Sequence, residues 1–183
     1  MKFSTRTGMA LAAPILLAAC GSAENETAQS AEPAAATAQQ QDSVGSVTGT
    51  IGGEQVDLYV VGGQSDHSSS HLSLYAMGEG LQARQLGALM IGAEWSGELG
   101  SNFSTAEVSI AKTGTTPARV YYADLDDGLV LTVTDSTLNG ETLEVTGTVE
   151  GTLTAADRTG NRNPDPQDTL DVKLNFNANV NPL

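Results

Sequence analysis

Both histidines of the chain lie in one short segment, Asp66-His67-Ser68-Ser69-Ser70-His71. Imidazoles and carboxylates are zinc ligands, and serine, histidine and aspartate together can form the nucleophilic site of a hydrolase. In an extended strand His67 and His71 would lie on one face, about 13 Å apart at 3.3 Å per residue. Two ligands of one zinc ion must be much closer than that, so only a turn through the serines could bring the two rings together.

The surroundings of these residues do not favour catalysis. The serines lack the glycine-flanked elbow of a nucleophile, and no oxyanion-hole motif accompanies them. The chain has no third histidine to complete a zinc site. We therefore expect a solvated polar loop, a protein that is not an enzyme and no cofactor, with a metal-dependent hydrolase as the third choice of function.

Two further loops are rich in side-chain oxygens, residues 124–128 and residues 157–168. Calcium takes about six to eight oxygen ligands, and the second loop has enough of them, although neither loop has EF-hand spacing. Arg158 and Arg162 lie among the acids of the second loop. Because Asp, Asn, Gly and Pro also form turns, we expect both loops to be turns. The weak candidates for a metal site are His67, His71, Asp157, Asp165 and Asp168.

The elements that must position these residues are β-strands. In residues 142–154 the odd positions are Leu, Val or Gly and the even positions are Thr or Glu, and residues 170–180 alternate with the opposite parity. Alternation with period two predicts half-buried antiparallel strands. Asn139-Gly140 and Gly52-Gly53 are typical of tight hairpins. Further strands are expected at residues 47–51, 56–61, 71–76, 106–111, 120–125 and 129–134.

Residues 44–183 are therefore predicted to form one all-β domain, an antiparallel β-sandwich or flattened barrel, jelly-roll-like, with eight to nine strands. The ambiguous segment is residues 81–94, where the leucines fit a short helix or a strand. Gly87 and Gly92 weaken the helix, so we favour a strand.

A polar surface is expected where the threonines of residues 142–154 lie beside Asn175, Asn177 and Asn179. Hydroxyl and amide groups could bind a glycan there. Threonine is also what an exposed strand prefers, and glycan sites usually present aromatic rings, of which this chain has few. A glycan partner is therefore an alternative reading of this surface.

The first residues have the layout of a secretory signal peptide: Lys2 and Arg6, then an apolar run, then Leu17-Ala18-Ala19-Cys20-Gly21. The apolar run is too short to span a bilayer. The small residues closing on cysteine resemble the lipobox of bacterial lipoproteins. The resemblance implies that residues 1–19 are cleaved off and that Cys20 is acylated. In this family an aspartate after the cysteine tends to retain the protein in the inner membrane. Because residue 21 is glycine, the resemblance implies an anchor in the outer membrane.

Residues 21–43 contain no aliphatic side chain larger than alanine. Residues 20–43 are therefore predicted to be a flexible tether that begins at the lipidated Cys20. Cleavage would leave 6 basic and 22 acidic residues, a formal charge of −16. That charge repels nucleic acid and anionic membrane surfaces, so we expect no nucleic-acid partner.

These features predict a non-enzymatic lipoprotein of the cell envelope, held by its lipid in the outer membrane, with the domain in the periplasm or at the cell surface. Its role would be structural or an interaction with an envelope protein. The alternative is a ligand-binding module for a glycan or small molecule. Convergence of the His67 and His71 rings with Asp66 would favour the hydrolase, and a concave site with exposed aromatic groups would favour ligand binding.

Overall fold

The computed structural model describes residues 42–99, 101–113, 119–157 and 163–183. Cys20, Arg158, Arg162 and the expected signal peptide and tether up to residue 41 lie outside them. The described residues form the strands β1 (Ser43–Ile51), β2 (Glu54–Val61), β3 (Asp66–His67), β4 (His71–Met77), β5 (Ala88–Trp95), β6 (Phe103–Lys112), β7 (Arg119–Asp124), β8 (Val130–Asn139), β9 (Thr142–Asp157) and β10 (Pro164–Pro182). A 3-10 turn, η1 (Gly62–Gln64), follows β2, and the helix α2 (Gly80–Leu86) follows β4.

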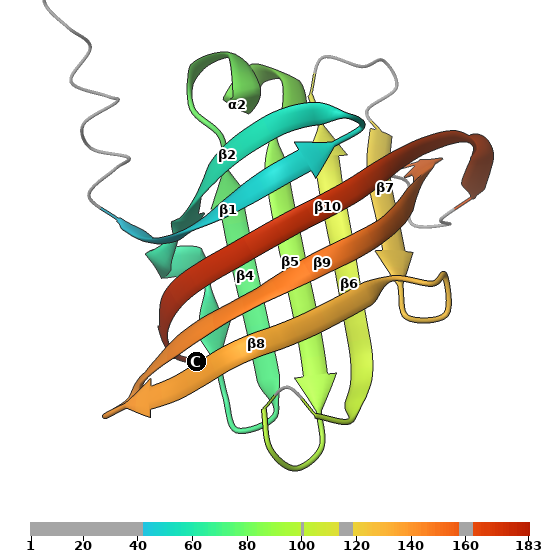
Figure 1. Cartoon of the computed structure of the whole chain (residues 1–183). Helices are drawn as coiled ribbons and strands as arrows, with labels where there is room; N and C mark the ends of the chain where they lie inside the picture. The colour runs from blue at the N-terminus through green and yellow to red at the C-terminus, as the bar shows by residue number, and fades with distance from the viewer. Residues whose placement is uncertain (1–41, 100, 114–118, 158–162) are drawn as a thin grey trace, which may run out of the picture. The chain divides into compact units, whose positions relative to one another are not determined.

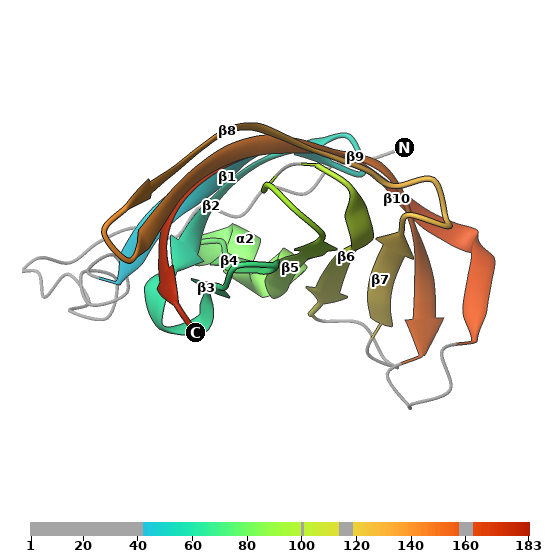
Figure 2. The same ribbon diagram turned by 90° about the horizontal axis from the view of Figure 1, so that it is seen from below.

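Eight of these strands pair in a closed circuit, which makes the domain a flattened barrel. The circuit runs β1, β2, β4, β5, β6, β7, β9, β10 and back to β1, and it closes between β2 and β4 through only two residue pairs. Strand β8 pairs with the first part of β9 on the edge whose last part pairs with β7, and β3 pairs in parallel with the end of β10. Figures 1 and 2 show β1, β2, β8, β9 and β10 crossing over the layer of β4 to β7.

The predicted all-β fold, a sandwich or flattened barrel, is thus confirmed. The described residues form ten strands where eight to nine were expected, because β3 has only two residues and leaves no alternation in the sequence. Most strands pair with their neighbours in the chain. This meander order differs from the jelly-roll-like order that we expected, which requires Greek-key connections.

The alternation in β9 and β10 has the predicted parity. Val145, Val149 and Leu153 are buried on β9, as are Val172, Leu174, Phe176, Ala178 and Val180 on β10. Gly147 lies opposite Phe176, and a Cβ atom there would overlap the Phe176 ring and the Thr132 carbonyl oxygen. The glycine on the apolar face of β9 therefore leaves room for the Phe176 ring in the core.

Residues 81–94, which we favoured as a strand, divide into the helix α2 and the strand β5 at Gly87, whose φ is 61°. Only the second half alternates, with Leu89 and Ile91 buried. The helix buries none of its residues. Instead the Gln82 amide contacts the outer edge of β2: its oxygen accepts from the Asp57 N–H and its nitrogen donates to the Gln55 carbonyl, both at 3.4 Å. The helix thus covers part of an open strand edge.

Candidate functional site

The two histidines are joined by a turn, as zinc binding would require, yet their rings separate. Strand β3 pairs with β4 so that His67 lies opposite Leu72, and the Ser68 N–H donates to the His71 carbonyl at 2.9 Å. His67 is 8% exposed and faces the interior with Leu72, so the expectation of a solvated polar loop is wrong for this residue. The side chain of His71 is 37% exposed, and its Nε2 lies 3.6 Å from Asp66 Oδ1. Neighbouring strand positions point to opposite faces, which is why the rings do not converge.

The His67 ring has a structural contact. Its Nε2 lies 2.8 Å from the Glu141 carbonyl oxygen, which can only accept, so Nε2 carries the proton. This bond ties the β3–β4 turn to the β8–β9 hairpin. The His67 carbonyl in turn accepts from the Leu183 N–H at 3.0 Å. His67 therefore holds three parts of the chain together at one end of the barrel.

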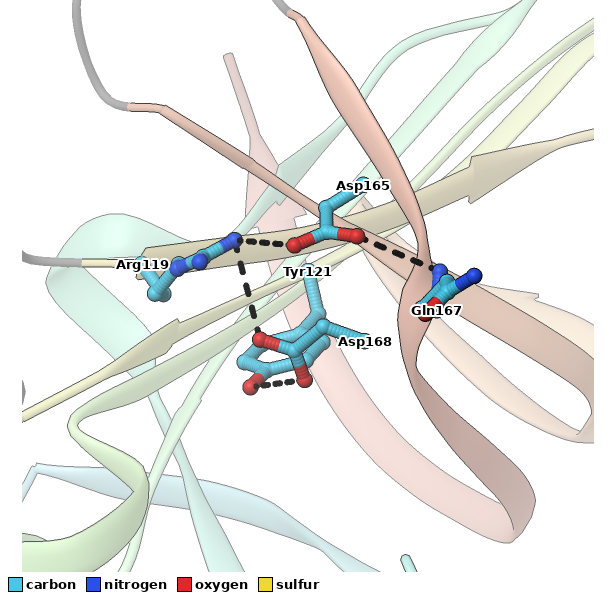
Figure 3. A network of polar contacts seen from close by, with 5 residues as sticks. All are labelled: Arg119, Tyr121, Asp165, Gln167 and Asp168. Carbon is cyan, nitrogen blue, oxygen red and sulfur yellow. Dashed lines mark hydrogen bonds and ion pairs between the residues drawn. The ribbon is translucent and has the colours of Figure 1, made fainter.

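The carboxylates of the calcium candidate gather around an arginine from another strand (Figure 3). Arg119 Nη1 of β7 lies 3.3 Å from Asp165 Oδ2 and 3.6 Å from Asp168 Oδ2. The Tyr121 hydroxyl donates to Asp168 Oδ1 at 2.9 Å. Burial, and then this bond to the carboxylate, raise the pKa of Tyr121. Asp157 pairs with Arg119 through the backbone, and its side chain lies outside the described part of the structure.

Arg119 was not considered from the sequence because it lies 46 residues before Asp165. Its guanidinium provides the positive charge that a cation would bring to these two carboxylates. Residues 164–168, which we expected within a turn, instead belong to β10. The other acidic loop is a turn, as expected: Asp124 Oδ1 accepts from the Asp126 and Asp127 N–H groups at 2.9 and 3.2 Å. Among the described residues no three His, Cys, Asp or Glu side chains are grouped to hold a metal.

We expect thermal unfolding to be the same in EDTA, millimolar calcium and micromolar zinc. A cation that binds only the folded state adds about 2.7 kcal/mol at a hundredfold excess over its Kd, and this would raise the melting temperature by several degrees. Arg119→Met, measured alongside, should melt lower in all three solutions because Asp165 and Asp168 lose their counter-charge. A saturable rise in melting temperature of the unsubstituted protein with either ion would contradict this.

The threonine and asparagine rows form a polar outer face, as expected. Thr148 lies opposite Asn175, and Thr146 lies opposite Asn177. A hollow of about 300 Å³ on this face is bordered by Asp135, Thr137, Glu144, Val145, Thr146, Asn177 and Asn179. A second hollow, of about 420 Å³, is bordered by His71 and four carboxylates, those of Glu94, Glu107, Asp124 and Asp126. Neither hollow has a Phe, Tyr or Trp residue in its wall.

A third hollow, which we call the end pocket, is lined by the turn that precedes β4, by the end of β5 with the loop after it, and by the β8–β9 hairpin. Its volume is about 430 Å³. Its nine lining residues are His67, Ser68, Ser69, Trp95, Leu99, Ser136, Thr137, Leu138 and Leu143. None of them is Asp, Glu, Lys or Arg. Leu138, at 62% exposure, is one of the most exposed large apolar residues described. The end pocket is therefore mainly apolar, with a few hydroxyl groups.

Trp95, the only tryptophan of the chain, lines this pocket and has a buried polar atom. The residue is 5% exposed, and its indole Nε1 is buried without a hydrogen-bond partner among the described residues. A buried N–H left unpaired costs about 1–3 kcal/mol. The sequence alone predicts no site at Trp95 and indicates only that the chain has few aromatic residues. No local pattern indicates the pocket, because its lining comes from three distant parts of the chain.

Comparison of the chain with protein-family models, with curated proteins and with solved structures gives no match. No helix in the described ranges is both long enough and apolar enough to cross a bilayer.

Proposed function

We propose that the protein is a non-enzymatic lipoprotein of the outer membrane whose barrel binds a small molecule in the end pocket. The Leu17 to Cys20 motif supports the lipid anchor, and the end pocket supports the binding role. Of the roles considered from the sequence, a concave and mainly apolar pocket favours the ligand-binding module over a purely structural role, although Trp95 is buried and not exposed as that role was expected to require. The observation that carries this proposal is a mainly apolar hollow lined by Trp95, whose buried indole N–H has no hydrogen-bond partner among the described residues.

The size and chemistry of the end pocket fit this role. Small-molecule sites usually have volumes of about 300–1,000 Å³, a mostly apolar wall and a few fixed polar groups. The end pocket, at about 430 Å³, combines Trp95, Leu138 and Leu143 with serine and threonine hydroxyls. The Glu141 bond from His67 holds the β8–β9 hairpin at one side of it. The wall therefore has a defined geometry without a ligand.

The same contacts favour binding over hydrolysis. His67 and three serines do share the pocket wall, but the His67 Nε2 proton is committed to the Glu141 carbonyl. The neighbouring carboxylate, Asp66, lies beside His71 instead. A serine nucleophile needs a histidine base that an acid orients, and here the acid and the pocket histidine are separate.

The binding role can be tested with N-phenylnaphthylamine, a neutral apolar dye, in the whole chain carrying Cys20→Ser so that no detergent competes. Because Trp95 is the only tryptophan, energy transfer from indole to dye reports occupancy of its surroundings. We expect saturable transfer. Leu138→Asp, which adds a charge to the pocket wall, should weaken binding by at least about tenfold, or about 1.4 kcal/mol.

Val130→Asp is the matched control, since Val130 is 59% exposed on the same strand and does not line the pocket. It should leave the dye affinity unchanged. Absence of saturable transfer, or an equal loss in the two variants, would refute the end pocket as a binding site.

A further inference from the structure

We infer that the ligand of the end pocket is an uncharged, mainly apolar molecule with one acceptor oxygen, such as a ketone or ester carbonyl, that bonds to Trp95 Nε1. This inference rests on the proposed binding function and specifies the chemistry of its ligand.

The apolar part of the ligand follows from the wall. Leu99, Leu138 and Leu143 provide branched aliphatic groups, and Trp95 adds an aromatic ring. Contact with these side chains removes apolar ligand surface from water, which is the main favourable term for such a ligand. The exposure of Leu138 indicates that the free protein leaves part of this surface uncovered.

The acceptor oxygen follows from the unpaired indole. An indole N–H is a donor only, so a hydroxyl hydrogen or an ammonium group cannot satisfy it, whereas a carbonyl oxygen can. Because this N–H is buried in the free protein, the inferred bond requires a side chain of the pocket wall to move when the acceptor binds. Rotamer changes of this kind are common on binding. A ligand without an acceptor leaves the N–H unpaired and gains less.

The absence of charge follows from the lining and from the whole chain. None of the nine lining residues is an acid, a lysine or an arginine, so a buried ionic group would lack a counter-charge. The excess of 22 acidic over 8 basic residues also repels anions at long range. Fatty-acid carboxylates and alkylammonium ions are therefore poor ligands.

Three probes of matched shape test this: butylbenzene, benzylacetone, which adds a ketone oxygen to it, and hydrocinnamate, in which a carboxylate replaces the methyl ketone. Their affinities are measured by displacement of N-phenylnaphthylamine, followed by the dye's own fluorescence, from the whole chain carrying Cys20→Ser. The ratio of the butylbenzene Kd to the benzylacetone Kd measures how much the ketone oxygen strengthens binding. This ratio should be about tenfold smaller in Trp95→Phe than in the protein with Trp95, because the variant keeps an aromatic ring and loses the N–H donor. Hydrocinnamate should bind weakest in both proteins.

A second measurement avoids dependence on the variant's folding. The single tryptophan gives one indole N–H signal in a proton–nitrogen NMR spectrum, and benzylacetone should move it downfield while butylbenzene should not. One outcome would contradict the ligand class and leave the binding function standing. In it, the dye and butylbenzene bind, but the ratio of the butylbenzene Kd to the benzylacetone Kd does not depend on Trp95, and benzylacetone does not move the indole signal. Tighter binding of hydrocinnamate than of benzylacetone would also contradict the inferred ligand class. If neither the dye nor any probe binds, the proposed function itself fails.

Discussion

Replacing Val145 with aspartate should destabilise the barrel by at least about 3 kcal/mol, enough to unfold much of a marginally stable domain. Val145 is 2% exposed on β9, opposite Ala178 of β10 and Ser136 of β8. The carboxylate would enter the apolar core, and the contacts of the valine methyl groups would be lost as well. Urea unfolding followed by the fluorescence of Trp95 measures the change in free energy.

Thr148→Asp is the matched control, three positions further along β9 on the outer face. Thr148 is paired with Thr132 and Asn175, which carry no charge, whereas Thr146 lies opposite Asp135 and would add repulsion. The Thr148 variant should change the free energy of unfolding by about 0.5 kcal/mol or less. Equal losses in the two variants would mean that the two faces of β9 are not distinguished by burial.

The sequence was sufficient for elements whose signal is local. The parity of β9 and β10 could be predicted because each side chain's exposure follows from its position along a single strand. The Gly52-Gly53 hairpin could be predicted because both residues need positive φ, and they have φ of 58° and 83°. The division of residues 81–94 at Gly87 was missed, since leucines at mixed spacing fit both kinds of element.

The candidate sites depend on residues far apart in the chain, and this is where sequence analysis was insufficient. Arg119 reaches Asp165 only because β7 and β10 both pair with β9. Trp95 and Leu138 line one pocket only because the fold brings the β8–β9 hairpin near the end of β5. A pattern within one strand contains neither relation. The same limit explains why His67 and His71 were considered together although the hairpin turns them to opposite faces.

Replacing Cys20 with serine should release the protein from the membrane fraction almost completely. The residue lies outside the described ranges, and the prediction rests on the lipobox-like residues Leu17 to Cys20. Each buried CH₂ of an acyl chain contributes about 0.8 kcal/mol to membrane binding, and stable anchoring needs more than one chain. Without acyl chains, electrostatic attraction cannot hold the protein at the membrane, because the chain is acidic and an anionic lipid surface repels it. Immunoblots of salt-washed membranes and of the soluble fraction give the distribution.

Gly21→Asp is the companion variant, because it keeps the acylated cysteine and changes only the residue that follows it. If the resemblance to bacterial lipoproteins holds, this protein should remain in the membrane fraction but move from the outer to the inner membrane on a sucrose gradient. Mass spectrometry of the unsubstituted protein should find no peptide that precedes Cys20. Retention of the Cys20→Ser protein after the salt wash would show that the chain is held by something other than a lipid on this cysteine.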